Sequence, residues 1–208
     1  MHIPDGFLDP WLCILFYVIS LIALILSVKR VKLSEENIGL VSILTASVFA
    51  AQLLDWPIPG GTTAHFVGGA LLGILFGPYL GSVVMSLILL IQALLFGDGG
   101  VTTLGANIWN MGIISVFSGY FIYRFITKLT NNRYKYIAAF IAGWFSTVLA
   151  AFFAGLELGL STIFLYPIYV TIPAMVLWHL GFGLVDGLVT SGVVGYLERY
   201  RPKILGGE

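Results

Sequence analysis

The stretch that decides the fold runs from Trp11 to Arg30 and reads WLCILFYVISLIALILSVKR. Its apolar part, residues 11–28, contains no Asp, Glu, Lys or Arg. Because a helix needs about 20 apolar residues to cross the hydrocarbon core of a membrane, this part predicts a transmembrane helix. Two basic residues follow it directly, which is typical of a cytoplasmic end.

The composition of the whole chain indicates an integral membrane protein. Of its 208 residues 59% are hydrophobic and only 10% are charged, against about 25% charged in an average soluble protein. The formal net charge of zero argues against a nucleic-acid-binding protein. The single cysteine, Cys13, excludes a disulfide framework and a cysteine-based zinc site.

Six further apolar tracts follow the first, so we expect a bundle of seven transmembrane helices. The expected spans are 11–28, 38–54, 65–76, 79–96, 106–127, 136–156 and 172–197. Gly77-Pro78 predicts a tight turn between the third span and the fourth. The stretch 157–171 has room for a short additional helix, although Pro167 and Pro173 interrupt its path.

The positions of the basic residues predict the orientation of this bundle. They form three clusters: Lys29, Arg30 and Lys32; Arg124, Lys128, Arg133 and Lys135; and Arg199, Arg201 and Lys203. Seven spans with the N-terminus outside put all three clusters in the cytoplasm, as the positive-inside rule requires. The expected fold is therefore an all-α membrane domain over residues 1–208, with residues 1–10 external and the C-terminus cytoplasmic.

The external N-terminus, Met-His-Ile-Pro-Asp-Gly-Phe-Leu, can chelate a metal ion. The Met1 amine and the His2 amide nitrogen close a five-membered ring on a metal, and the amide nitrogen and Nδ1 of His2 close a six-membered ring. Together they supply three nitrogens of a square plane, a geometry that suits Ni²⁺ or Cu²⁺. Because the amide must lose its proton, we expect the affinity to fall at low pH.

The fourth nitrogen has two candidates, since the chain has only three histidines. His65 lies at the expected external start of the third span, on the side of Met1. His179 lies within the seventh span, where it could instead form an intramembrane polar pair with Asp186, seven residues on. We favour His65 as the ligand, with Thr63, Asp98 and Asn107 as candidate partners for its second ring nitrogen.

Several blocks of this sequence together resemble one family of metal transporters. They are residues 1–8, Pro59-Gly-Gly-Thr-Thr-Ala-His65, Gln92 to Gly100, Gly105 to Ile108 and Asn110-Met-Gly112. They resemble the NikM/CbiM family, the substrate-binding (S) components of nickel and cobalt energy-coupling-factor transporters. The family usually has Glu where Asp186 stands, which leaves the role of Asp186 open.

The resemblance implies a site, a fold and partners. It implies a nitrogen plane from Met1, His2 and His65, a six-helix core over residues 38–197, and an additional first helix that delivers the N-terminus. It also implies a transmembrane coupling (T) component, two ABC ATPases and a small accessory membrane subunit, in the cell membrane of a prokaryote. Ala46 and Ala50 are the expected contacts with the coupling component, although small residues also serve ordinary helix packing.

These features predict a capture component for nickel or cobalt uptake, with nickel favoured, no cofactor and no enzymatic activity. Uptake of cobalt for cobalamin biosynthesis is the alternative. The chain has no phosphate-binding Gly-x-x-x-x-Gly-Lys-Ser/Thr loop, so we expect separate subunits to supply the energy. An intramembrane enzyme is less favoured, because no His-Glu-x-x-His motif is present. A channel is also less favoured, and it predicts no sensitivity to the N-terminal amine.

Overall fold

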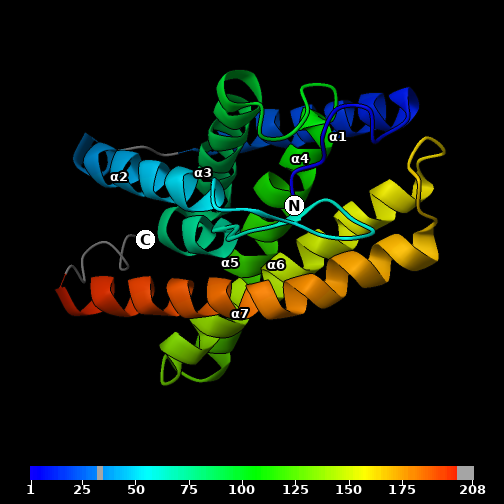
Figure 1. Cartoon of the computed structure of the whole chain (residues 1–208). Helices are drawn as coiled ribbons and strands as arrows, with labels where there is room; N and C mark the ends of the chain where they lie inside the picture. The colour runs from blue at the N-terminus through cyan, green and yellow to red at the C-terminus, as the bar shows by residue number, and fades with distance from the viewer. Residues whose placement is uncertain (32–34, 201–208) are drawn as a thin grey trace.

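A computed structural model describes residues 1–31 and 35–200, and helices make up most of it (Figure 1). In chain order its elements are α1 (Pro10–Val28), α2 (Glu35–Gln52), β1 (Trp56–Pro57), β2 (Thr63–Ala64), α3 (Gly69–Ile91), η1 (Gln92–Phe96), α4 (Leu104–Asn107), η2 (Ile108–Ser115), α5 (Val116–Leu129), α6 (Lys135–Leu160) and α7 (Ile168–Tyr200). The basic residues Lys32, Arg201 and Lys203 lie outside the described ranges.

Within these ranges, four helical stretches are long and apolar enough to cross a membrane. They are Pro10–Val28, Gly69–Phe96, Lys135–Leu160 and Ile168–Tyr200, with Ile38–Gln52 as a shorter apolar helix. The helical membrane fold is therefore confirmed in outline, and the count of seven spans with its orientation stays a prediction.

The backbone breaks inside α3 at the turn predicted from Gly77-Pro78. Gly77 has a φ of 76°, a conformation that is not helical and that suits glycine. A Cβ atom on Gly81 would lie 3.0 Å from the carbonyl group of Leu72, nine residues earlier. Because nine residues of straight helix extend about 13 Å, the two halves of α3 must be sharply bent against each other.

The structure settles two points about the segments between the spans. The third span begins at Gly69 rather than near His65, because residues 65–68 are not helical and Gly68 has a φ of 73°. Before them, residues 56–64 form a short antiparallel hairpin in which Trp56 pairs with Ala64. No additional helix lies in 157–171. Instead α6 continues to Leu160 and α7 begins at Ile168, directly after Pro167, a position where the missing N–H of proline costs little.

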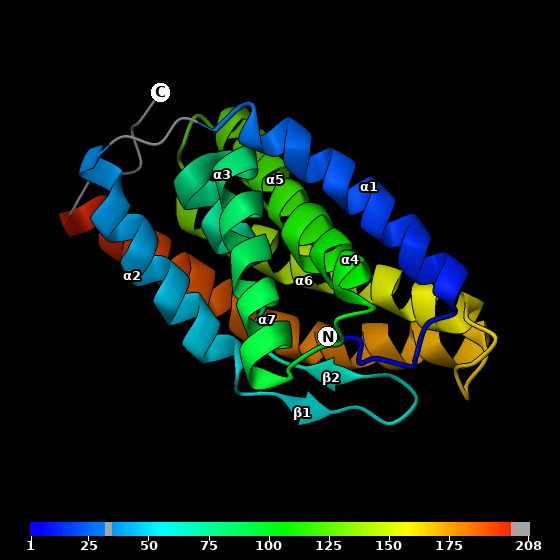
Figure 2. The same cartoon turned by 90° about the horizontal axis from the view of Figure 1, so that it is seen from above.

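Close packing between helices depends on glycine. Helices α6 and α7 run antiparallel, and a Cβ atom on Gly143 would lie 2.9 Å from the Cα of Gly187. On one flank α1 contacts α4 at Gly105, whose carbonyl accepts a hydrogen bond of 2.7 Å from Ser20 (Figure 2). Because van der Waals contact drives helix association in lipid, such close approaches stabilise the bundle.

Candidate metal centre

The first three residues fold back into the bundle. Met1 and Ile3 have no exposed surface, and His2 is 2% exposed. Asn107 holds both backbone groups of Ile3: its Oδ1 accepts from the Ile3 nitrogen at 2.8 Å and its Nδ2 donates to the Ile3 carbonyl at 3.1 Å. The N-terminus is therefore fixed in place, between the β1–β2 hairpin and the loop before α4 (Figure 2).

Thr63 holds the amine of Met1. The amine donates to the carbonyl oxygen of Thr63 and, at 2.7 Å, to Oγ1 of the same residue. Burial, partly opposed by the charges of Asp55 and Asp98, holds the pKa of this amine well below its ordinary value of 8.0. A neutral amine has two N–H groups and one lone pair, so with both N–H groups on Thr63 the lone pair is available to a metal ion.

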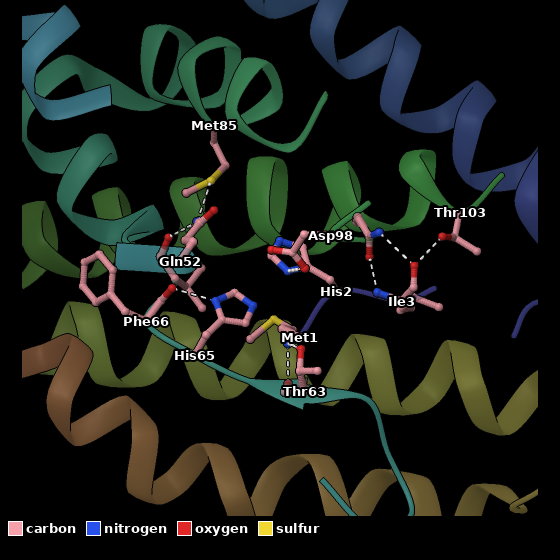
Figure 3. Close-up of polar contacts among 12 residues, drawn as sticks. Met1, His2, Ile3, Gln52, Thr63, His65, Phe66, Met85, Asp98 and Thr103 are labelled. Carbon is pink, nitrogen blue, oxygen red and sulfur yellow. Dashed lines mark hydrogen bonds and ion pairs between the residues drawn. The ribbon is translucent and has the colours of Figure 1, made fainter. Parts of the chain in front are cut away.

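The rings of His2 and His65 lie parallel beside this amine, with centroids 4.5 Å apart and an interplanar angle of 8° (Figure 3). Nδ1 of His65 lies 2.7 Å from the carbonyl oxygen of Phe66. We therefore assign the proton to Nδ1, because a carbonyl can only accept. Nε2 of His65 then carries a lone pair, and it is buried with no hydrogen-bond partner among the described residues.

His2 faces a carboxylate. Its Nδ1 lies 2.8 Å from Oδ1 of Asp98, within ion-pair distance, but neither ring nitrogen meets the geometry of a hydrogen bond. Burial lowers the pKa of His2, and Asp98 partly opposes that shift. The pKa of His65 falls well below 6.5, first because of burial and then because of the Met1 amine and His2. At neutral pH both rings are thus uncharged, the state that metals require of histidine.

The three residues expected to support His65 have other partners. Thr63 binds Met1, Asn107 binds Ile3 and Asp98 faces His2, while the second ring nitrogen of His65 bonds to the backbone of Phe66. The sequence could not indicate Phe66, because any residue type supplies a carbonyl.

His179 and Asp186 do not pair with each other in the described structure. Nδ1 of His179 bonds to the Met175 carbonyl at 2.7 Å, whereas Asp186 accepts from the backbone nitrogens of Val67 and Gly68. Nε2 of His179 is buried without a hydrogen bond. The sequence singled out both residues as polar groups in a membrane helix, but their partners depend on the tertiary fold.

A cavity of about 340 Å³ lies beside the site. His2 and Thr63 line it, together with three carboxylates, those of Asp5, Asp55 and Asp98. Asp5 is fixed by Thr102, whose backbone nitrogen donates to Oδ1 at 2.7 Å. The negative charge around this cavity favours the approach of a cation.

Side chains alone do not make a metal site here. Among the described residues, no group of three or more His, Cys, Asp or Glu side chains could hold a metal ion. The groups that converge are the amine of Met1 and the rings of His2 and His65, and the backbone amide of His2 lies next to them. The structure thus defines a class: a helical membrane protein that buries its N-terminal amine beside two neutral histidines.

Comparison with known proteins identifies the family. A family model described as "CbiM: Cobalt uptake substrate-specific transmembrane region" matches residues 2–204. A relative from Archaeoglobus fulgidus, "Putative fused nickel transport protein NikMN", is 52% identical over 99% of this chain and 68% of its own length. "Cobalt transport protein CbiM" of Thermosipho melanesiensis is 31% identical over 99% of this chain and 89% of its own length.

A solved structure titled "Crystal Structure of an Truncated Transition metal Transporter" superimposes with a TM-score of 0.92 at 37% identity, covering 96% of this chain and 99% of that one. The chain belongs to the CbiM family, and the resemblance inferred from the sequence is confirmed.

Proposed function

We propose that this chain is the substrate-capture membrane component of a nickel or cobalt uptake transporter. The substrate ion is held by four nitrogens: the Met1 amine, the His2 amide, Nδ1 of His2 and Nε2 of His65. One observation carries the proposal. A buried amine with both N–H groups occupied lies beside two imidazoles, three of whose ring nitrogens have no hydrogen-bond partner among the described residues.

The charges around the site fit a divalent ion. Once its amide nitrogen has lost a proton, the proposed ligand set carries one negative charge, so the complex with a divalent ion is singly positive. Asp98, 2.8 Å from His2, supplies the opposite charge close by. A buried charge is tolerated when it has such a partner, which favours a dication at this position.

The choice of metal follows from the donors. Nitrogen donors in a plane favour Ni²⁺ over Co²⁺, and the Irving–Williams order points the same way. The relative from Archaeoglobus is named for nickel and the one from Thermosipho for cobalt. Nickel is therefore our first candidate, and uptake of cobalt for cobalamin biosynthesis is the second.

We further propose that the chain works in the cell membrane of a prokaryote, with seven spans, an external metal site and a cytoplasmic C-terminus. Its partners are a transmembrane coupling component, two ABC ATPases and a small accessory membrane subunit. Ala46 and Ala50 are exposed on α2, where a partner helix can approach. Small residues favour close contact between helices in lipid.

The test of the site is one extra residue in front of Met1. The insertion turns the amine into an amide and pushes the new amine out of the buried position, so Ni²⁺ binding in a calorimetric titration should be lost. Adding the same residue at the C-terminus is the matched control. Undiminished affinity in the N-terminal variant would refute the chelate, and His65→Ala should lose affinity through the fourth nitrogen.

The test of the transport role is uptake of Ni²⁺ and Co²⁺ by cells. We expect uptake only when the ATPase and coupling subunits are co-expressed with this chain. Full uptake by the chain alone would contradict the proposed division of labour. Titration with both ions in competition shows which one the site prefers.

A further inference from the structure

We propose that Asp186 is a positioning residue of the metal centre. Its buried carboxylate holds the backbone segment that presents His65, and it thereby sets metal affinity through His65 alone. The part of this inference that concerns metal rests on the function proposed above, whereas the part that concerns the backbone stands without it.

Asp186 lies in α7 with no exposed surface, and four donors surround its carboxylate. Its Oδ2 accepts from the backbone nitrogens of Val67 at 2.9 Å and Gly68 at 3.2 Å. Oδ2 also accepts from the hydroxyl of Thr147 on α6 at 2.7 Å, and Oδ1 accepts from that of Thr190 at 3.3 Å. One side chain therefore joins α6 and α7 to the segment after His65.

That segment, residues 65–68, connects β2 to α3 and determines where the His65 ring lies. Gly68 precedes α3 with a φ of 73°, and the carbonyl of Val67 accepts a hydrogen bond of 2.6 Å from Gln52. The His65 ring is bonded to the Phe66 carbonyl of the same segment. Because the ring is tied to its own backbone, a shift of Val67 and Gly68 moves Nε2 of His65 with them.

The four donors explain why this position carries an acid. Two are the backbone N–H groups directly before α3, at the end where a helix leaves its N–H groups unpaired and favours negative charge. The other two are hydroxyls. A carboxylate accepts at both oxygens and its charge strengthens each bond, so it can serve all four, whereas an asparagine has a single, uncharged oxygen to accept with.

The first experiment measures the backbone without any metal. In the purified full chain, the amides of Val67 and Gly68 should be protected from hydrogen exchange. In Asp186→Asn their exchange should be at least about 10-fold faster, because the neutral amide oxygen is a weaker acceptor than the charged carboxylate oxygen. Unchanged protection of both amides would overturn the proposal.

The second experiment measures Ni²⁺ affinity in a double-mutant cycle. Asp186→Asn should weaken binding by about 10-fold, the scale known for residues that orient a metal ligand. In a His65→Ala background the same substitution should change affinity by less than about 2-fold, because its effect passes through His65. An equal loss in both backgrounds would show a general structural effect and overturn the proposal.

The matched control is Glu157→Gln, which removes a carboxylate of similar burial. Glu157 is 1% exposed on α6 and accepts from Asn110 at 2.7 Å, with no hydrogen bond to residues 65–68. Its substitution should leave both the exchange at Val67 and Gly68 and the affinity within about 2-fold. A loss as large as that of Asp186→Asn would count against a specific role.

If Asp186→Asn does not fold, Thr147→Val replaces it, because this variant removes the 2.7 Å donor that fixes Oδ2. It should show a smaller loss of affinity that again disappears with His65→Ala, and a loss that persists there overturns the proposal. Should the unaltered protein bind neither Ni²⁺ nor Co²⁺, the proposed function fails, while the exchange experiment still decides the role of Asp186.

Discussion

Thr63 illustrates how a single residue prepares the amine of Met1. It accepts both N–H groups, one with its carbonyl and one with its hydroxyl. A free N-terminal amine in water rotates and carries a proton, whereas this one is held in a single orientation. Both contacts come from Thr63 and restrict the amine to one orientation, which lowers the cost of binding an ion at this position.

We predict that Thr63→Val weakens Ni²⁺ binding by about 5-fold, since losing one hydrogen bond costs about 1 kcal/mol. Valine keeps the shape of the side chain, and the carbonyl contact remains. The neighbouring Thr62→Val is the control, because Thr62 contacts Met175 rather than the amine. Calorimetric titration of both variants checks the expectation, and equal affinities would refute a role for the hydroxyl.

We also predict that the metal-free protein becomes less stable as the pH falls. The pKa values of the Met1 amine, His2 and His65 lie below their ordinary values of 8.0, 6.5 and 6.5. Below those values the unfolded chain binds protons that the folded chain does not, which favours unfolding. Each group contributes up to about 1.4 kcal/mol per pH unit until its folded pKa is reached.

Thermal unfolding of the metal-free protein between pH 8 and pH 5 measures this effect. The midpoint should decrease toward pH 5, and the decrease should be smaller in His65→Gln, which lacks one of the groups. A midpoint that is constant, or that rises toward pH 5, would contradict the sign.

At the scale of elements, α1 matters because the N-terminal segment leads directly into it. Helix α1 packs against α4 at Gly105, where the backbones are so close that a Cβ atom on Gly105 would lie 2.6 Å from the Cα of Tyr17. Asp9, just before α1, is fixed by Thr162, whose backbone nitrogen donates to its Oδ2 at 2.6 Å. The N-terminal segment is thus held from α1 as well as through Ile3.

We predict that Gly105→Ala destabilises the protein by about 1–3 kcal/mol through overpacking and also weakens Ni²⁺ binding. The methyl group pushes α1 away, and the N-terminal segment moves with it. Gly192→Ala on α7 is the control, since a Cβ atom there meets nothing within 4 Å. Thermal unfolding and titration test both variants, and a Gly105→Ala protein with unchanged stability and affinity would refute the coupling.

At the scale of the whole molecule, negative charge gathers around the cavity that leads to the site. Asp55 is exposed and lines this cavity, and its charge acts on both the Met1 amine and His2. Such a charge changes how fast a cation arrives more than how firmly it is held.

We predict that Asp55→Asn slows Ni²⁺ association several-fold at low ionic strength and leaves dissociation unchanged. The difference should shrink above about 0.1 M salt, where the Debye length is about 10 Å. Glu198→Gln is the control, because Glu198 pairs with Lys135 and does not line this cavity. Stopped-flow kinetics separate the two rates, and a change in dissociation alone would refute steering.

The sequence predicted the helical membrane fold, the break at Gly77 and the family, because each depends on local composition or on a motif. It also singled out Met1, His2 and His65, which the structure brings together. It could not predict the hairpin of residues 56–64 or the continuation of α6 to Leu160. The hairpin and the end of α6 depend on which neighbouring segments cover them. In the same way, the tertiary structure decides that Thr63 binds Met1 and not His65.

By itself, then, the sequence supplied the donors proposed for the metal: an amine, an amide and two imidazoles. Only the tertiary structure decided how those donors are held. Asn107 fixes Ile3, Thr63 fixes the amine and Asp186 fixes the segment after His65, each from 60 or more residues away in the chain. The physical reason is that hydrogen bonds in a buried site depend on distance in space, which a linear sequence does not record.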